Sequence, residues 1–156
     1  MKSFLRYWGP AIGWSACIFL FSTGLFSSQK TSHFLFPILE WLFPQATSTE
    51  ILHAHEFLRK VGHFLEFFIL SLFLLRGLRS GRPGWRLSWA CAAVALAAGY
   101  AALDELHQAF VPTRIASLFD VFIDTSGAAT AQFLAGLRAR LAPGFRRFLD
   151  ASSHSL

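Results

Sequence analysis

The segment YWGPAIGWSACIFLFSTGLFSSQ, residues 7–29, contains 23 residues and no Asp, Glu, Lys or Arg. An apolar run of about 18 residues or more is the usual signal of a membrane-spanning helix. A second run, LSWACAAVALAAGYAAL at residues 87–103, has 17 residues without a charge. Two further apolar stretches, residues 61–78 and 117–137, are interrupted by acidic residues. We therefore expect an all-α membrane protein, a bundle of four transmembrane helices in a single domain that covers residues 1–156.

Composition also favours a membrane protein and argues against a nucleic-acid-binding protein. Hydrophobic residues make up 54% of the chain and charged residues only 15%, a balance that is rare in a soluble domain of this size. The formal net charge of +5 at pH 7 would by itself suggest nucleic-acid binding. Most basic residues, however, flank the apolar stretches, where they serve as signals of membrane orientation. We therefore expect the lipid bilayer as a partner and no nucleic acid.

The distribution of Lys and Arg predicts the orientation. With the N-terminus inside, the inner segments hold ten basic residues: Lys2, Arg6, Arg76, Arg79, Arg82, Arg86, Arg138, Arg140, Arg146 and Arg147. The outer segments then hold four: Lys30, Arg59, Lys60 and Arg114. Positive residues favour the cytoplasmic side. We expect both termini in the cytoplasm, residues 138–156 as a basic cytoplasmic tail, and residues 27–60 and 104–116 outside.

An aromatic segment separates the first two predicted spans. Residues 33–43 are rich in Phe, Leu, Ile and Trp and are followed by Pro44. The segment is too short to cross a bilayer, so we expect a short interfacial or re-entrant outer segment. A loop packed on the bundle is the alternative. Capped by Ser48 or Thr49, the next helix is expected to continue without a break to Arg79.

Small residues indicate where helices approach closely. Gly127, Ala131 and Ala135 recur at intervals of four, and residues 87–103 are rich in alanine. Small residues at this spacing let helix backbones come together in a membrane, although alanine also simply favours helix. We expect residues 87–103 and 117–137 to form a close-packed antiparallel pair.

Four acidic residues lie where a membrane helix normally has none: Glu66, Asp104, Asp120 and Asp124. Each ionisable group costs roughly 2.5–3.5 kcal/mol in hydrocarbon on insertion scales and usually faces a bundle interior. Glu66 lies 13 residues before Arg79, and Asp124 lies 14 residues before Arg138. Both carboxylates are therefore roughly 20 Å above the inner interface. We expect them to meet around a pocket that opens outward, with at least one hydrogen-bonded to Lys60, His63, Asp104 or His107.

Further polar residues share helical faces with these acids. Lys60, His63 and Glu66 follow one another at intervals of three and so lie on one side of a helix. Asp104 is followed on its own face by a histidine and a glutamine. The expected ligand-binding or functional cluster comprises Lys60, His63, Glu66, Asp104, Glu105, His107, Gln108, Arg114, Asp120 and Asp124.

Each of these acids also has a purely structural interpretation, which for Glu66 is a hydrogen bond inside the bundle. Asp120 fits a variant of the capping box with Ser117, ahead of an apolar run. Asp104 and Glu105 would mark the water-exposed end of their helix. These interpretations stay open beside the functional one.

Arg114 and Asp124 carry the expected long-range pairing. Opposite charges near a low-dielectric boundary attract strongly, so we expect Arg114 to turn toward Asp120 or Glu105. Asp124 lies too deep in its helix to act as a cap. Its structural alternative is a buried salt bridge with Arg114 or Lys60.

These residues form three motifs: Lys60-x-x-His63-x-x-Glu66-Phe67, Asp104-Glu105-x-His107-Gln108-x-Phe110-x-Pro112-x-Arg114 and Asp120-x-x-x-Asp124-x-x-Gly127. Over roughly residues 27–137 the chain resembles the VanZ-like family, small bacterial integral membrane proteins. The family is named for a component of glycopeptide-resistance clusters associated with low-level teicoplanin resistance. The chain departs from many members at Asp124, where they carry Asn. The resemblance implies a multi-pass protein of the bacterial cytoplasmic membrane with a role in the cell envelope.

Three classes of function fit the cluster. The first, which we favour, is a non-enzymatic protein whose outer polar pocket binds a cell-wall precursor, a lipid headgroup or an amphiphilic glycopeptide, with a contribution to teicoplanin-type resistance. The second is a membrane-embedded enzyme that acts on a lipid-linked phosphate, either with a divalent cation or by acid–base catalysis. No spacing here is a strong metal signature such as His-Glu-x-x-His. The third is a proton-coupled transporter, which would require an oligomer.

Overall fold

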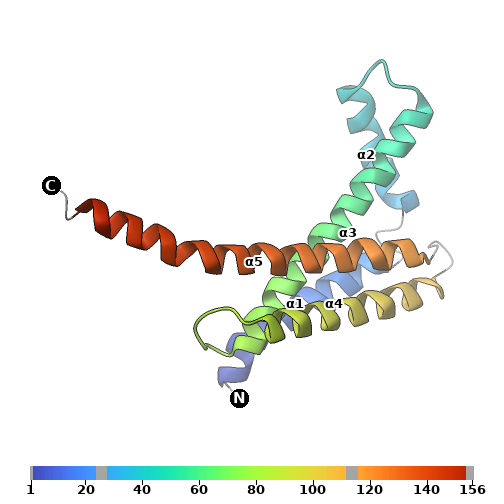
Figure 1. Cartoon of the computed structure of the whole chain (residues 1–156). Helices are drawn as coiled ribbons and strands as arrows, with labels where there is room; N and C mark the ends of the chain where they lie inside the picture. The colour runs from blue at the N-terminus through green and yellow to red at the C-terminus, as the bar shows by residue number, and fades with distance from the viewer. Residues whose placement is uncertain (1, 24–27, 112–115, 154–156) are drawn as a thin grey trace.

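Five helices make up the parts of the chain that the computed structural model describes, residues 2–23, 28–111 and 116–153 (Figure 1). They are α1 (Lys2–Ser22), α2 (Ser28–Leu42), α3 (Ser48–Arg79), α4 (Leu87–Gln108) and α5 (Leu118–Ser153). No strand occurs within those ranges. The expected all-α class is therefore confirmed.

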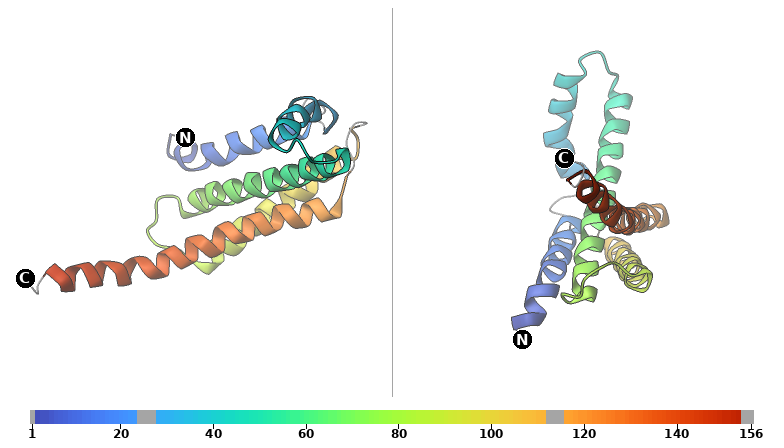
Figure 2. Two further views of the ribbon diagram at one scale, coloured as in Figure 1. Left: turned by 90° about the horizontal axis from the view of Figure 1, so that it is seen from above. Right: turned by 60° about the vertical axis from the view of Figure 1, so that its left-hand side comes forward.

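The long helix α3 organises the bundle. It packs against all four other helices, and its contact with α5 is the most extensive in the molecule. α4 packs on both α3 and α5, and α1 lies along α3 and touches α4 (Figure 2). The core at their junction combines large and small side chains: Ile18, Phe67 and Leu70 with Ala97, Ala101 and Ala128. The alanines bring the helix axes close, because they leave room for the larger side chains between them.

Two helices in the described ranges, α3 and α4, are long and apolar enough to cross a membrane. The four expected spans are thus not all recovered by length and composition. α5 carries two aspartates in its first two turns. The charge-free stretch that begins at Tyr7, within α1, continues past Ser22 into residues 24–27, which lie outside the described residues.

The start of α3 depends on a capping box. Thr47 is the N-cap: its backbone N–H donates to the Glu50 carboxylate at 2.7 Å, and the Glu50 N–H donates to the Thr47 hydroxyl at 3.4 Å. We had expected Ser48 or Thr49 as the cap, but only Thr47 has the Ser/Thr-x-x-Glu spacing that closes both bonds. The expected unbroken course to Arg79 is confirmed.

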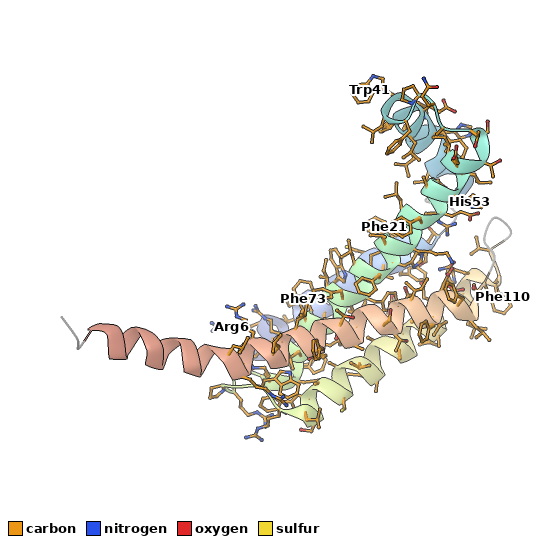
Figure 3. The ribbon with its side chains drawn as sticks, turned by 45° about the horizontal axis from the view of Figure 1, so that its top comes forward. Arg6, Phe21, Trp41, His53, Phe73 and Phe110 are labelled. Atoms are coloured by element: carbon orange, nitrogen blue, oxygen red, sulfur yellow. The ribbon has the colours of Figure 1, made fainter. Side chains whose placement is uncertain are left out.

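The aromatic segment before α3 is a helix, so the alternative of a packed loop was wrong. α2 contacts α3 alone among the described helices. The two form a hairpin that projects from the other helices (Figure 1). Leu39 and Ile51 are buried between them, whereas Phe34, Ile38 and Trp41 are exposed on α2 (Figure 3 labels Trp41). The hairpin therefore presents an apolar face to its surroundings.

The two ends of the bundle differ in charge. The Arg76 guanidinium donates to the Arg6 backbone carbonyl at 3.0 Å, which places the start of α1 beside the end of α3. The turn that joins α3 to α4 and the second half of α5 lie at this same end (Figure 2). Most of the basic residues therefore gather here, and four acids, Asp104 and Glu105 of α4 and Asp120 and Asp124 of α5, lie at the other end. The expected tail beyond Arg138 continues α5 as helix to Ser153.

The small residues of α5 contact two helices. α4 and α5 do pack against each other, but Gly127 of α5 faces α3. A Cβ atom at Gly127 would overlap the backbone carbonyl of Phe64. Nearby, the Ser71 hydroxyl donates to the Ala128 carbonyl at 3.0 Å, and the Gln132 amide donates to the Ser71 carbonyl at 2.9 Å. Ala135 packs against Leu75 of α3 and against Trp89 and Ala93 of α4. The small-residue spacing thus indicated the packing face of α5 and its expected partner α4, but not its contact with α3.

Candidate functional site at the acidic end of the bundle

Side chains from three helices meet at the acidic end. α3 contributes Lys60 and His63 from its middle, and α5 contributes Asp120 and Asp124 from its first two turns. The Lys60 ammonium lies 3.8 Å from the Asp120 carboxylate. His63 Nδ1 lies 3.6 Å from Asp124 Oδ1. Spacings of three on α3 and four on α5 therefore bring two pairs, Lys60 with Asp120 and His63 with Asp124, into register across the helix interface.

Asp124 is fully buried, with 0% of its side chain exposed. We had expected a hydrogen bond within the cluster, or a salt bridge to Arg114 or Lys60. Its partner is His63, one of the residues expected within the cluster, at 3.6 Å, an ion-pair distance that is longer than a hydrogen bond. Neither carboxylate oxygen of Asp124 has a hydrogen-bond partner among the described residues. Buried polar groups are normally hydrogen-bonded, so this carboxylate is suited to exchange a proton or to accept a bond from a ligand.

Asp104 is also buried, which excludes its interpretation as the water-exposed end of α4. Its Oδ2 accepts hydrogen bonds from the Ser22 hydroxyl at 2.7 Å and from the Gln108 amide at 2.8 Å. The expected link to Gln108 is thus present. The link to Ser22 joins α1 to the site and was missed, because nothing in the sequence distinguishes this serine from others near it.

Glu105, and not Asp120, accepts the backbone N–H of Ser117 at the start of α5. Its buried carboxylate accepts the Ser117 N–H at 2.7 Å. In a capping box that N–H would bond to the residue three positions later. Asp120 instead pairs with Lys60, so the capping-box interpretation was wrong. The Lys60 ammonium also lies 4.3 Å from the centre of the Phe119 ring, a cation–π contact.

Two expected site residues do not join these pairs. His107 lies against Phe19 of α1, with ring centres 4.9 Å apart. Arg114 lies outside the described residues, so its pairing with Asp120 or Glu105 stays a prediction.

A cavity of about 250 Å³ opens beside His63, between α1, α2 and α3. Its lining combines apolar and polar side chains: Phe21, Ser22, Thr31, Leu35, Leu58, Arg59, Gly62, His63 and Glu66. His63 therefore contacts the buried Asp124 and also lines this cavity, which it shares with Glu66. Glu66 and Asp124 thus lie on either side of this histidine, one in the cavity lining and one at 3.6 Å from Nδ1, and their direct convergence stays a prediction. Arg59 was counted only as an outer basic residue, because its place depends on how α2 packs.

The donor set does not favour a metal ion. No group of three or more His, Cys, Asp or Glu side chains in residues 2–23, 28–111 and 116–153 is arranged to hold one. Cys17 and Cys91 are free thiols on separate helices. The divalent cation considered from the sequence therefore has no fitting site in the described part of the chain. The arrangement instead offers acids, an imidazole and two cationic side chains for polar binding or proton transfer.

The chain was compared with known protein families, curated proteins and solved structures. The family model described as VanZ/LLP1 matches residues 7–138, a range that contains every expected site residue. No curated protein and no solved structure matches the chain.

Proposed function

We propose that this chain, which belongs to the VanZ/LLP1 family, is a four-span protein of the bacterial cytoplasmic membrane that binds the polar head of an envelope amphiphile. In this proposal α1, α3, α4 and α5 cross the bilayer, and α2 lies at its outer surface. Both termini are in the cytoplasm. The membrane placement is supported by the two long apolar helices α3 and α4 and by the gathering of basic residues at one end of the bundle.

The proposed topology has a direct test by single-cysteine labelling. Cys17 and Cys91 are first replaced by serine, and a cysteine is then placed at Arg82 or at Phe110, which are both exposed and lie at opposite ends of the bundle. We expect a membrane-impermeant maleimide applied from outside to label position 110 and not position 82, because basic ends stay in the cytoplasm. Labelling of position 82 but not of position 110 would show that the protein has the opposite orientation.

The observation that carries the binding proposal is the position of His63, between the buried Asp124 and the cavity. At about 250 Å³, the cavity is smaller than a typical pocket for a whole small molecule, roughly 300–1,000 Å³. It would therefore hold one polar group of a larger molecule. Arg59 can grip a phosphate or carboxylate, while Leu35 and Leu58 contact an apolar chain. A lipid headgroup or the phosphate of a lipid-linked cell-wall precursor fits this combination.

A whole glycopeptide does not fit a cavity of that size. A contribution to teicoplanin-type resistance would then arise through the precursor lipid that the protein holds, and not through enclosure of the antibiotic.

Arg59→Gln is expected to weaken binding of a labelled polyprenyl pyrophosphate about tenfold or more. A hydrogen bond to a charged group contributes about 1.5–3 kcal/mol, and about 1.4 kcal/mol corresponds to a factor of ten. Affinity would be measured by fluorescence anisotropy on purified protein in nanodiscs. Arg82→Gln, which removes the same charge at the opposite end, is the control and should bind like the wild type. Wild-type affinity in both Arg59→Gln and Glu66→Gln would refute the binding site.

The contact between His63 and Asp124 favours a second candidate, an enzyme that hydrolyses a lipid-linked phosphate. With Nδ1 facing the carboxylate, Nε2 is the ring nitrogen left to accept a proton from water. The water oxygen would attack phosphorus as the bond to the leaving oxygen breaks. Release of inorganic phosphate in the same nanodiscs, abolished by His63→Gln, would identify an enzyme. Binding without release would identify a binding protein.

A further inference from the structure

A second hollow lies at the opposite, basic end of the bundle. It is a groove of about 610 Å³ between α4 and α5. Buried small residues, including Ala90 and Gly136, line it, and so do the exposed large side chains of Leu87, Phe133 and Leu137. The groove is thus apolar, with a small-residue floor and bulky sides, and its shape suits a flexible hydrocarbon chain.

One end of the groove carries an unused hydrogen-bond donor. Trp85, in the turn before α4, lines the groove and packs over Gly136, where a Cβ atom would lie 3.1 Å from its ring. The Trp85 indole Nε1 is buried and has no hydrogen-bond partner among the described residues. An indole N–H can only donate. An oxygen acceptor that enters at this end of the groove can satisfy this N–H, which an apolar chain cannot do.

Positive charge lies at the same end. Arg140 lines the groove. Arg86 is the N-cap of α4 and makes no side-chain capping bond, so the positive end of the α4 dipole lies beside Leu87 without a side-chain cap. The N-terminus of a helix attracts anions. An arginine, a helix N-terminus and an unused indole N–H thus converge at the mouth of an apolar groove.

We propose that this groove binds one acyl chain of an anionic phospholipid from the cytoplasmic leaflet. The phosphate lies at Arg140 and the N-terminus of α4, and an ester carbonyl accepts the Trp85 N–H. Anionic lipids are drawn to basic residues at this surface. The site is separate from the cavity beside His63, but it rests on the same membrane placement.

A second copy of the chain is the rival occupant. Two copies in one membrane share the same orientation, and a two-fold contact through this groove would bring Arg140 against Arg140 of the partner. Like charges disfavour such a contact, whereas a phosphate neutralises them. The charge at the mouth therefore favours the lipid.

Native mass spectrometry of the full chain, released from detergent, tests the proposal. Phosphatidylglycerol and phosphatidylcholine with identical acyl chains are titrated separately. The wild type should bind phosphatidylglycerol about tenfold more tightly, as expected for one charge-assisted contact. Arg140→Gln should remove most of that preference. Arg138→Gln is the matched control, since Arg138 lies outside this groove and should keep it.

Substitutions that fill the groove distinguish lipid binding from dimerisation. Ala95 and Ala129 line the groove and are exposed, so Ala95→Trp and Ala129→Trp fill it without entering the core. Each variant should lose the phosphatidylglycerol that the wild type binds in native mass spectrometry. Ala16→Trp, on the exposed face of α1, should keep it. Equal wild-type affinity for the two lipids, or an Arg140→Gln variant that keeps the preference, overturns the proposal. So does a Trp variant that retains lipid but loses a dimer seen in the wild type.

Discussion

Gly127→Ala is expected to lower the free energy of unfolding by about 3 kcal/mol, at the upper end of the usual range for overpacking. The added Cβ atom would overlap the Phe64 carbonyl, which belongs to the backbone of α3. A backbone carbonyl cannot rotate away as a flexible side chain can, so α5 must move from α3. Unfolding in a mixed-micelle denaturant titration measures the loss. Because Phe64 adjoins His63, the same shift should separate His63 from Asp124 and weaken ligand binding.

The chain offers a matched control on α4. A Cβ atom at Gly99 would meet nothing within 4 Å, and Gly99 is exposed. Gly99→Ala should change stability by about 0.5 kcal/mol or less, or raise it slightly through helix propensity. Similar stabilities for Gly127→Ala and Gly99→Ala would show that α3 and α5 do not approach as closely as described.

Asp124→Leu is expected to weaken ligand binding about a hundredfold without lowering stability. The wild-type carboxylate is fully buried and lacks hydrogen bonds among the described residues, and such burial is costly. Leucine removes that cost, and His63 can become neutral, so no unpaired charge remains. The loss of about 3–5 kcal/mol that follows when one partner of a buried ion pair is removed arises from the charge left behind, and a neutral His63 leaves none. Binding should nevertheless fall about a hundredfold, a change of about 2.7 kcal/mol, because nothing then orients His63.

Asp124→Asn provides the graded comparison. It keeps a polar group of the same shape beside His63 and should retain part of the binding. Affinity for the labelled polyprenyl pyrophosphate and unfolding free energy would be measured for all three proteins. A fall in stability by more than about 3 kcal/mol in Asp124→Leu would indicate that the pair holds the bundle together. Wild-type affinity in Asp124→Leu would show that Asp124 does not contribute to ligand binding.

The sequence by itself determined the elements and the chemistry near them. Apolar runs predicted the helices of residues 87–103 and of α3, including its unbroken course to Arg79. The acids at unusual positions predicted a polar cluster, and the three motifs indicated the family. These features depend on residues a few positions apart, and helical periodicity is enough to place them on a common face.

Only the tertiary structure decided which residues of different helices contact one another. Asp124 meets His63, Asp104 meets Ser22, and Gly127 meets Phe64, across separations of roughly 60 to 80 residues along the chain. Periodicity states which face of a helix is polar, but not how far that helix is rotated or shifted against its neighbours. Those two variables are set by the packing of many side chains at once. The same packing placed Arg59 on the cavity and left the groove beside Arg140 open.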